Sequence, residues 1–444
     1  MIPIYQTDLT NGRLTEEQVR AAMQWKQLHN LDIANIDKYY KGQNPTIIES
    51  SHEHKIPVPF GRKLIKMVTG FMFKEGAITY AWPDGSDVDL TNLITAIYDH
   101  EDEQTENVKL GRDQAKYGSA FEILFVDNDE GRPEFSRVKA SQVVPIYSRT
   151  VKPRMIAAIN FYPSGDGDVV EVYYTDRIEM FHYSREKVVS KGVVAHQFGE
   201  VPVIEFRNNE EGMGDIESIL SLIDAHDEIL ANGLDEDGKY ADALLILKNF
   251  SLDDEALDKL IRLRVIDGLD ADAVAEYLTK EGAYEGREVL RKVIEGLIYA
   301  MSGVPNLDDK DAMAQQSGEA LKYLYATFEV MVAGDKQSEF TNGLMRRMRL
   351  VNNFLTWMGQ SSGNLDGMVV NWKRNLPNES TTLVDNVVKA EAIISRKTAL
   401  EQLQKAGIVV DVDDEEKRLE EDRERRSQDM TNVNLTGGAY GQTV

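Results

Sequence analysis

The chain has 444 residues, no cysteine and a formal net charge of −25 at pH 7, with 75 acidic and 50 basic side chains. This length exceeds what one hydrophobic core usually supports, so we expect two or more subdomains. The lack of cysteine excludes disulfides, thiolate zinc sites and cysteine nucleophiles. Because no apolar run could span a bilayer and the N-terminus has no signal-peptide pattern, we expect a protein made and used in the cytosol, or in particles assembled there.

The first 126 residues are predicted to be mainly helical. Apolar residues at helical spacing indicate helices, and two short apolar runs indicate strands. The expected helices cover residues 16–38, 60–73 and 90–116, and the expected strands cover residues 78–82 and 120–126. Tyr117-Gly118 precedes the second strand, and Asp127–Gly131 after it is a strong turn signal.

An antiparallel sheet is predicted over residues 135–206. This stretch is rich in Val, Ile, Tyr and Phe, and clusters such as Pro163–Asp168 mark turns between its apolar runs. After Gly214 the apolar spacing becomes helical through Leu234. A short strand over 243–248, a short helix over 253–263 and a further α/β piece ending at 278 are expected next.

The most informative pattern is a pair of helices that flank one acidic loop. The first covers residues 284–302, and its apolar residues lie along a single stripe: Val289, Leu290, Val293, Ile294, Leu297, Ile298 and Met301. Pro305 cannot continue this helix and belongs to the loop Gly303–Gln316. Ser317 is the expected N-cap of a second helix that runs to about Met358. Unbroken, it would be roughly 60 Å long, and Gly334 and Gly343 are positions where it could bend.

The C-terminal part is predicted to contain one strand and then helices. The strand covers residues 368–372, and the helices cover residues 381–394, 396–406 and 413–427. The last helix mixes Glu and Arg at helical spacing and is expected to be a solvated face. Residues 427–444 are rich in Asn, Thr and Gly and are expected to be disordered. The predicted fold class is α+β.

Three polar motifs invite a chemical interpretation, and none is specific. His52-Glu53-His54 could supply two metal ligands, but no third ligand has a telling spacing, so a solvated patch is favoured. His226, in His226-Asp227-Glu228, could act in acid–base chemistry, yet a helical histidine is more often packed or interfacial. Asp235–Gly238 resembles a calcium loop without its ligand register, and the chain has no Walker-type phosphate loop. We expect no catalytic residue, no cofactor and no metal.

The acidity of the chain and one basic cluster bear on nucleic acid binding. Proteins that grip duplex DNA usually carry a basic face, because neutralising phosphates releases counterions. On composition alone, a net charge of −25 favours a soluble acidic protein without nucleic acid contact. The other interpretation is a surface that lets DNA pass without holding it. The cluster Arg346, Arg347 and Arg349 could meet DNA, but pairing with an acidic neighbouring subunit is favoured.

Several motifs occur in the order found in one known family. Ser317–Tyr323 reads Ser-Gly-Glu-Ala-Leu-Lys-Tyr, follows a Ser-Gly-Val-Pro loop and precedes a long helix with Phe340-x-x-Gly-Leu. Further motifs are Tyr117-Gly118, the run His196–Asn209, Gly214–Glu217, Leu222–Ala225, Trp372–Pro377 and Ile394–Thr398. With them, the chain resembles the portal proteins of tailed double-stranded-DNA bacteriophages from about residue 45 to residue 427. The type it resembles is that of siphophages of Gram-positive hosts.

The resemblance implies a portal fold with a mixed wing, a two-helix stem, a small α/β clip insert and a helical crown. The wing comprises residues 1–215, with helices and an antiparallel sheet, and residues 317–376, with the long helix and a strand. The stem helices are 216–242 and 283–303, and the clip between them is 243–282. The tunnel loop is 304–316, the crown is 377–427, and 428–444 is a disordered tail.

The same resemblance implies a ring at one capsid vertex, dodecameric in the virion, that forms the channel for DNA packaging and ejection. The implied partners are further copies of the chain, the double-stranded DNA in the channel, the terminase motor, the major capsid or scaffold protein and a head–tail adaptor protein, with no membrane. The protein would be in the host cytoplasm during assembly and then at the portal vertex of the virion. The expected DNA-channel residues of the tunnel loop are Asp308, Asp309, Lys310, Asp311, Gln315 and Gln316. The alternative from another class is a cytosolic metal-dependent enzyme that uses a carboxylate cluster.

Overall fold

The computed structural model describes residues 5–74, 76–82, 88–127, 131–184, 188–241, 245–248, 274–277, 284–307, 324–330, 334–361, 365, 367–374, 395–405, 412 and 414–420. The chain divides into two compact units, Met1–Asn375 and Leu376–Val444. The first unit contains both helices and sheets, which confirms the predicted α+β class. The second contains α13 (Arg396–Lys405) and a helical stretch over 414–420, both within predicted helices.

Local sequence signals set the ends of the first long helix, α1 (Glu16–Lys41). The Thr15 hydroxyl accepts a hydrogen bond from the backbone N–H of Gln18, and the Gln18 side chain accepts one from the backbone N–H of Thr15. This capping box satisfies two donors that the start of a helix leaves open. The helix ends at Gly42, whose φ of 72° lies in the left-handed region that glycine adopts easily. The helix predicted over 16–38 is confirmed.

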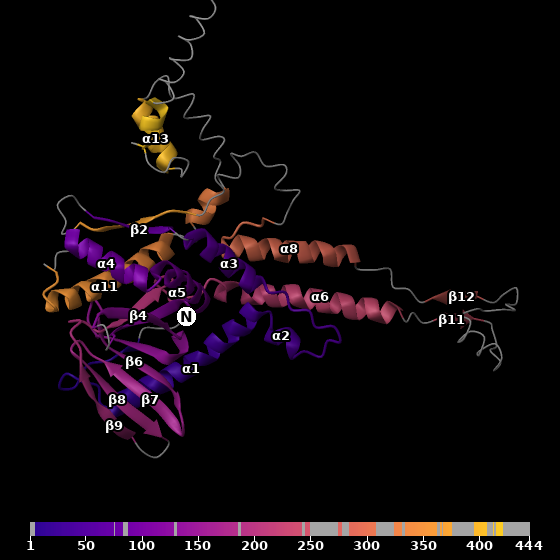
Figure 1. The fold of residues 1–444 in the computed structure, drawn as a ribbon. Coiled ribbons are helices and arrows are strands. Elements are labelled where there is room, and N and C mark those ends of the chain that lie inside the picture. The colour runs from indigo at the N-terminus through magenta and orange to yellow at the C-terminus, as the bar shows by residue number, and fades with distance from the viewer. Residues whose placement is uncertain are drawn as a thin grey trace, which may run out of the picture. The chain divides into compact units, whose positions relative to one another are not determined.

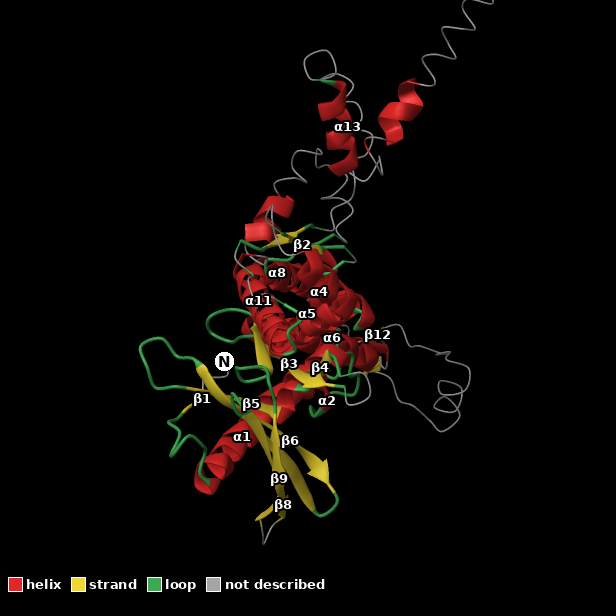
Figure 2. Ribbon diagram, turned by 60° about the vertical axis from the view of Figure 1, so that its left-hand side comes forward, coloured by secondary structure: helices red, strands yellow, loops and turns green. Residues whose placement is uncertain are grey.

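A six-stranded sheet lies against α1. Its strand order is β1-β5-β6-β7-β8-β9, with β1 (Tyr5–Gln6), β5 (Val143–Tyr147), β6 (Met155–Ser164), β7 (Gly167–Tyr173), β8 (Arg177–Ser184) and β9 (Val188–Ala195). All neighbours are antiparallel except β1, which runs parallel to β5. Val19, Ala22 and Met23 of α1 share one core with apolar residues of the sheet, so α1 covers one of its faces (Figure 2).

A second sheet shows that the predicted strand region contains two sheets rather than one. It has three antiparallel strands in the order β10-β3-β4: β10 (Val203–Arg207), β3 (Ser119–Val126) and β4 (Pro133–Val138). The main core joins this sheet to α3 (Phe60–Met72), α4 (Val88–His100), α5 (Glu103–Tyr117) and α11 (Gly334–Trp357). The strand pair β2 (Ile78–Ala81) and β13 (Val369–Trp372) confirms two more predicted strands.

The single helix predicted over 90–116 is wrong, because the chain breaks it into α4 and α5. Asp102, between the two, adopts a left-handed φ of 49°. Aspartate tolerates this conformation better than most residues. The break lets α5 turn into the main core, where Leu110 is fully buried. Neither glycine nor proline marks the position, so the sequence pattern runs through it.

The long helix predicted over 317–358 is represented by residues 324–330, which are helical, and by α11. Residues 317–323 and 331–333 lie outside the described residues. Gly343, expected as a possible bend, has a packing role: a Cβ there would lie 2.3 Å from a ring carbon of Phe206. Its missing side chain lets α11 approach β10 closely.

Two antiparallel helices form the remaining feature of the first unit. α6 (Leu220–Ala241), which follows the 3₁₀ turn η2 (Glu217–Ile219), and α8 (Tyr284–Ser302) lie side by side (Figure 1). Between them in sequence, β11 (Leu245–Lys248) pairs with β12 (Val274–Tyr277). The helix predicted over 284–302 is confirmed. The predicted helices 253–263 and 381–394 and the disordered end lie outside the described residues.

Candidate functional site

One face of α8 is apolar and exposed to solvent. Val289, Val293, Leu297 and Met301 follow one another at four-residue intervals, and each is 41–62% exposed. The predicted stripe is thus divided, because Ile298, next to Leu297 in sequence, is fully buried in the main core. A contiguous row of exposed aliphatic side chains is characteristic of a surface that another protein surface covers.

Small residues lie between these aliphatic side chains. Gly286, Gly296 and Ala300 are exposed on the same helix, and a Cβ at either glycine would meet no atom within 4 Å. A helix surface with few protruding atoms allows a neighbouring helix to come close. The face therefore has the composition of a helix–helix contact, and no helix among the described residues covers it.

Ion pairs hold the charges of α8 away from this face. The Arg291 guanidinium donates to Glu288 at 2.8 Å and to Glu295 at 2.9 Å, and it holds the pKa of Glu288 at about 2. Arg287 reaches across to Glu236 of α6 at 2.9 Å. Exposed pairs like these add little stability, so their main effect is to fix where the charges lie.

A groove of about 220 Å³ runs between the two helices. Its apolar lining comes from Ile229, Leu230, Gly233 and Leu234 of α6, and its charged lining comes from Arg287, Glu288 and Arg291 of α8. The helix pair thus offers both an apolar ridge and an adjoining groove. Because the ridges of one helix pack into the grooves of others, a ridge of this kind on one protein surface can fit a groove of this kind on another.

The outer half of α6 is held by the His52-Glu53-His54 segment. His52 Nδ1 and His54 Nδ1 contact the two carboxylate oxygens of Asp235 at 2.8 and 3.0 Å, and the His54 backbone N–H donates to the same carboxylate at 2.8 Å. The His54 backbone donor and the His52 side chain hold the pKa of Asp235 below its ordinary value. The segment is more than a solvated patch, since it clamps a carboxylate 181 residues further along the chain.

The inner half of α6 is packed against α3. His226 is buried with its ring edge-on to Phe60, at 4.9 Å between ring centroids, which confirms the packed interpretation of this histidine. Asp227 accepts hydrogen bonds from the Asn44 amide at 2.9 Å and the Val58 backbone N–H at 3.1 Å. Both side chains therefore take part in the packing of α6 against its neighbours.

Two of the motifs identified in the sequence meet at the base of α6. Gly118 and Gly214 pack so closely that a Cβ on Gly118 would lie 2.0 Å from the Gly212 carbonyl oxygen, and one on Gly214 would lie 2.4 Å from that of Lys116. The buried Lys336 ammonium of α11 donates to Asp215 at 2.8 Å and contacts Asn208. The start of α6 is therefore tied to both α5 and α11.

All three side chains of the arginine cluster of α11 have partners within the subunit, and the burial of Arg347 contradicts both sequence interpretations for that residue. Arg347 is fully buried and pairs with Glu122 and Glu103. Arg346 donates to the Val201 carbonyl at 3.1 Å, and Arg349 pairs with Glu200 at 2.8 Å. Spacing identified the apolar stripe of α8, but which of its residues are exposed depends on which side α6 covers.

The predicted DNA-channel residues of the tunnel loop cannot be placed. Val304 is buried and Leu307 is 40% exposed, whereas Asp308, Asp309, Lys310, Asp311, Gln315 and Gln316 lie outside the described residues.

Among the described residues, one group of three metal-ligand side chains converges: His100, Glu101 and Glu134. Arg132 pairs with Glu134 at 3.8 Å and contacts His100, so an arginine already supplies a cation there.

A helix pair with an uncovered apolar face, rooted in an α+β body, is typical of a protein that assembles with other chains. Comparison with known proteins identifies the family of this chain. The family model described as phage portal protein, SPP1 Gp6-like, matches residues 26–429, and the chain belongs to this family of phage structural proteins.

Two curated relatives agree with the family assignment. The portal protein of Clostridium phage phiCD119 is 21% identical over 76% of this chain and 82% of its own length. The portal protein of Bacillus phage SPP1 is 22% identical over 76% of this chain and 70% of its own length. The predicted membership among portal proteins of phages that infect Gram-positive hosts is thereby confirmed.

Among solved structures, the chain is similar to subunits of gene transfer agent particles. One is from the neck of an empty particle, with a TM-score of 0.44, 10% identity and coverage of 85% of this chain and 93% of that one. Another, from the native virion, has a TM-score of 0.42, 12% identity and the same coverages. The family assignment therefore rests on sequence. In the part of the chain that the structure describes, no helix is long and apolar enough to cross a membrane.

Proposed function

We propose that the chain assembles into a ring at one capsid vertex, and that this ring is the channel through which double-stranded DNA is packaged and later ejected. The observation that carries the proposal is the exposed apolar face of α8. In a closed ring, each subunit offers one surface to the neighbour on one side and a different surface to the neighbour on the other. The ridge of α8 and the groove between α6 and α8 provide two such surfaces.

The parts of the portal fold map onto the described elements as follows. The helices α6 and α8 fall within the proposed stem, residues 216–242 and 283–303. The pair β11–β12 falls within the proposed clip, 243–282. The two sheets with α1, α3, α4, α5 and α11 fall within the proposed wing, 1–215 and 317–376. The second compact unit begins at Leu376, close to the start of the proposed crown, 377–427, which the tail 428–444 follows.

The proposed channel would repel DNA rather than hold it. Twelve copies, the number that the family resemblance implies, would carry about −300 formal charges at −25 each, screened by counterions over about 10 Å. The proposed tunnel loop, 304–316, adds three aspartates against one lysine. Contacts with DNA in such a channel would be steric and brief, because no deep electrostatic well would hold a phosphate.

We further propose that the ring docks the terminase motor, a head–tail adaptor protein and the major capsid or scaffold protein, and that it acts without catalysis of its own. It would assemble in the host cytoplasm and remain at the portal vertex of the virion. The alternative of a metal-dependent enzyme is not favoured, since at the group His100, Glu101 and Glu134 the cation of Arg132 already pairs with Glu134.

Native mass spectrometry tests the assembly directly. The wild-type chain is expected to form rings, and Val293→Asp/Leu297→Asp is expected to leave folded monomers, because charges on the ridge would be buried without partners. Leu28→Asp/Leu31→Asp is the matched control, since both leucines are exposed on α1 at about 70%. Wild-type protein that stays monomeric at micromolar concentration across salt conditions would overturn the proposal.

A further inference from the structure

The loop that joins β5 to β6 is held in a defined shape by its own hydrogen bonds. The Ser148 backbone N–H donates to the Arg154 carbonyl at 2.9 Å, and the Arg154 backbone N–H donates to the Ser148 hydroxyl at 3.1 Å. The Thr150 hydroxyl donates to the Lys152 carbonyl at 2.8 Å and lies 3.0 Å from the Ser148 hydroxyl. A loop with these internal bonds loses little further entropy when it binds a partner.

This loop, residues 148–154, presents three cations and one apolar side chain. Arg149, Lys152 and Arg154 are exposed, and Val151 at the tip is fully exposed, at 107%. Arg149 makes a long hydrogen bond of 3.4 Å to the Gln6 carbonyl. Within the described part of the chain, the side chains of Lys152 and Arg154 have neither a hydrogen-bond nor an ion-pair partner.

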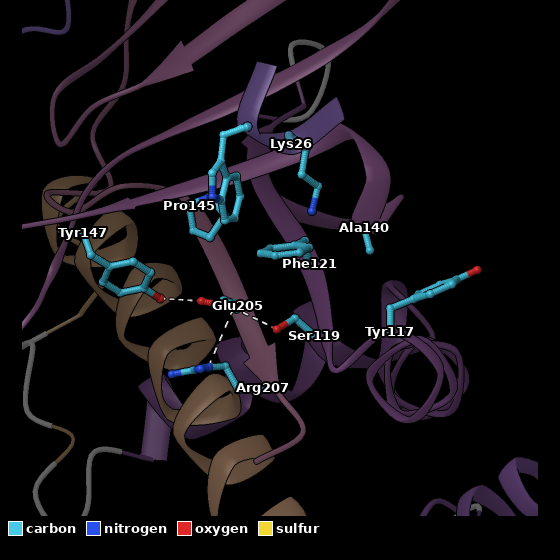
Figure 3. Close-up of a pocket in the computed structure, with 10 residues that line it drawn as sticks. Lys26, Tyr117, Ser119, Phe121, Ala140, Pro145, Tyr147, Glu205 and Arg207 are labelled. Carbon is cyan, nitrogen blue, oxygen red and sulfur yellow. Dashed lines mark hydrogen bonds and ion pairs between the residues drawn. The ribbon is translucent and has the colours of Figure 1, made fainter. Parts of the chain in front are cut away.

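The loop borders a large groove whose other arginines are already engaged. The groove has a volume of about 1080 Å³ and is lined by residues of the loop, of β10 and of α11. Arg349 pairs with Glu200, and Arg177 pairs with Asp176 at 2.9 Å. Figure 3 shows Tyr147 and Arg207 directed at the Glu205 carboxylate, which also accepts a hydrogen bond from Ser119. Among the described cations that line this groove, Lys152 and Arg154 of the loop are therefore the ones without a hydrogen-bond or ion-pair partner.

We propose that loop 148–154 docks on an acidic surface of a second copy of this chain, the neighbouring subunit of the ring. This inference rests on the proposed ring. The chain carries 75 acidic and 50 basic side chains, so a second copy offers mostly acidic surface. Cations that have no carboxylate partner among the described residues of their own subunit then find one across the interface, and Val151 gains a protein surface to cover it.

Charge complementarity favours a protein partner over DNA. Phosphates also attract arginine and lysine, but a chain of −25 repels a polyanion at distances where three cations cannot compensate. The ring instead holds a neighbouring subunit beside the loop. The effective concentration there is high enough for weak ion pairs to form.

The test is the charge-reversed variant Arg149→Glu/Lys152→Glu/Arg154→Glu, studied by native mass spectrometry with circular dichroism as the check on folding. It is expected to fold as wild type and to lose the ring population by at least tenfold. The matched control is Lys66→Glu/Lys74→Glu/Lys139→Glu, which changes the net charge equally at three exposed lysines and is expected to form rings.

A photo-crosslinker introduced as Val151→p-benzoylphenylalanine, with a DNA duplex present, keeps the two proposals separable. Chain-to-chain adducts at acidic peptides support the docking, and adducts to DNA overturn it. Normal rings from the loop variant overturn the docking while the proposed function stands. If the control variant also loses its rings, the loss comes from general charge repulsion between subunits, and this outcome would overturn the docking as well. Wild type without rings contradicts the proposed function, and the crosslinks still report on the loop.

Discussion

Arg347 of α11 and Glu122 of β3 form a fully buried ion pair. The Nε and Nη2 atoms of Arg347 donate to the two carboxylate oxygens of Glu122 at 2.7 and 2.8 Å. The remaining nitrogen, Nη1, reaches Glu103 at 3.1 Å and Asn107 at 3.0 Å, both on α5. Burial raises the pKa of Glu122, and the facing guanidinium opposes this rise. One arginine therefore joins α11, α5 and the three-stranded sheet at the centre of the proposed wing.

Arg347→Met should destabilise the fold by about 3–5 kcal/mol, because it leaves a buried carboxylate without its cation. The matched control is Arg349→Met on the same helix. Arg349 pairs with Glu200 on the surface, so its loss should cost about 0–1 kcal/mol. Urea denaturation of both variants measures the difference. Equal losses would show that the buried pair does not have this structural role.

Gly343→Ala should destabilise the fold by about 1–3 kcal/mol, since an added methyl group overpacks the contact between α11 and β10. A Cβ at this position would lie 2.3 Å from the Phe206 ring. The control is Gly334→Ala at the start of the same helix, where a Cβ would meet nothing within 4 Å; it should be neutral or slightly stabilising. The same denaturation measurement applies, and a neutral Gly343→Ala would contradict the close packing.

We predict that the buried Lys26 makes the stability of the fold rise with pH above pH 8. Its side chain is 1% exposed and points into a cavity of about 20 Å³, near Phe121 and Glu205 (Figure 3). Burial lowers the pKa of Lys26 to about 8, and Glu205 partly offsets this effect. Between pH 8 and the ordinary lysine pKa of about 10.4, the unfolded chain binds more protons than the folded chain, so this residue makes stability rise with pH.

Lys26→Met should remove that rise. Below pH 8 the folded state bears the cost of a buried ammonium, on the order of 3 kcal/mol for a shift of this size, and methionine removes it. The variant should therefore be more stable than wild type at pH 7, and the difference should shrink toward pH 10. Thermal unfolding of the two proteins from pH 7 to 10 gives the comparison. A difference that does not change with pH would mean that Lys26 titrates normally in the fold.

Local patterns were sufficient to predict most elements, because capping residues and apolar spacing act over a few positions. The helices Tyr284–Ser302 and Glu16–Lys41 are examples. The break at Asp102 was missed, since tertiary packing makes it without a glycine or proline. The partner of Arg347 could not be predicted either, because Glu122 lies 225 residues away and no local signal links them.

The α8 face that we assign to the contact between subunits could be predicted only in part, for a similar reason. Spacing placed seven apolar residues on one stripe of the helix over 284–302, but spacing cannot show which of them a second helix covers. The structure buries Ile298 and leaves Val293 half-exposed. The family resemblance rests on sequence motifs. Two of these motifs also have a structural role, since the segments that contain Gly118 and Gly214 pack closely at the base of α6.

The last prediction concerns the proposed tunnel loop, 304–316. Replacing Asp308, Asp309 and Asp311 by lysine should slow or stall DNA packaging, because lysines in the channel would make salt-dependent contacts with phosphates. The ring should still assemble, since in our assignment the α8 face rather than this loop carries the contact between subunits. Ring mass by native mass spectrometry and packaged DNA per particle are the two measurements.

The matched control is Asp308→Asn/Asp309→Asn/Asp311→Asn, which removes the same negative charges without adding positive ones. Packaging by this variant should stay close to wild type, because neutral amides make no counterion-releasing contact with phosphate. Raising the salt concentration should restore the lysine variant in part, since screening shortens the reach of its charges. Normal packaging by the lysine variant at low salt would mean that DNA does not pass close to this loop, and residues 304–316 would then have to be placed outside the channel.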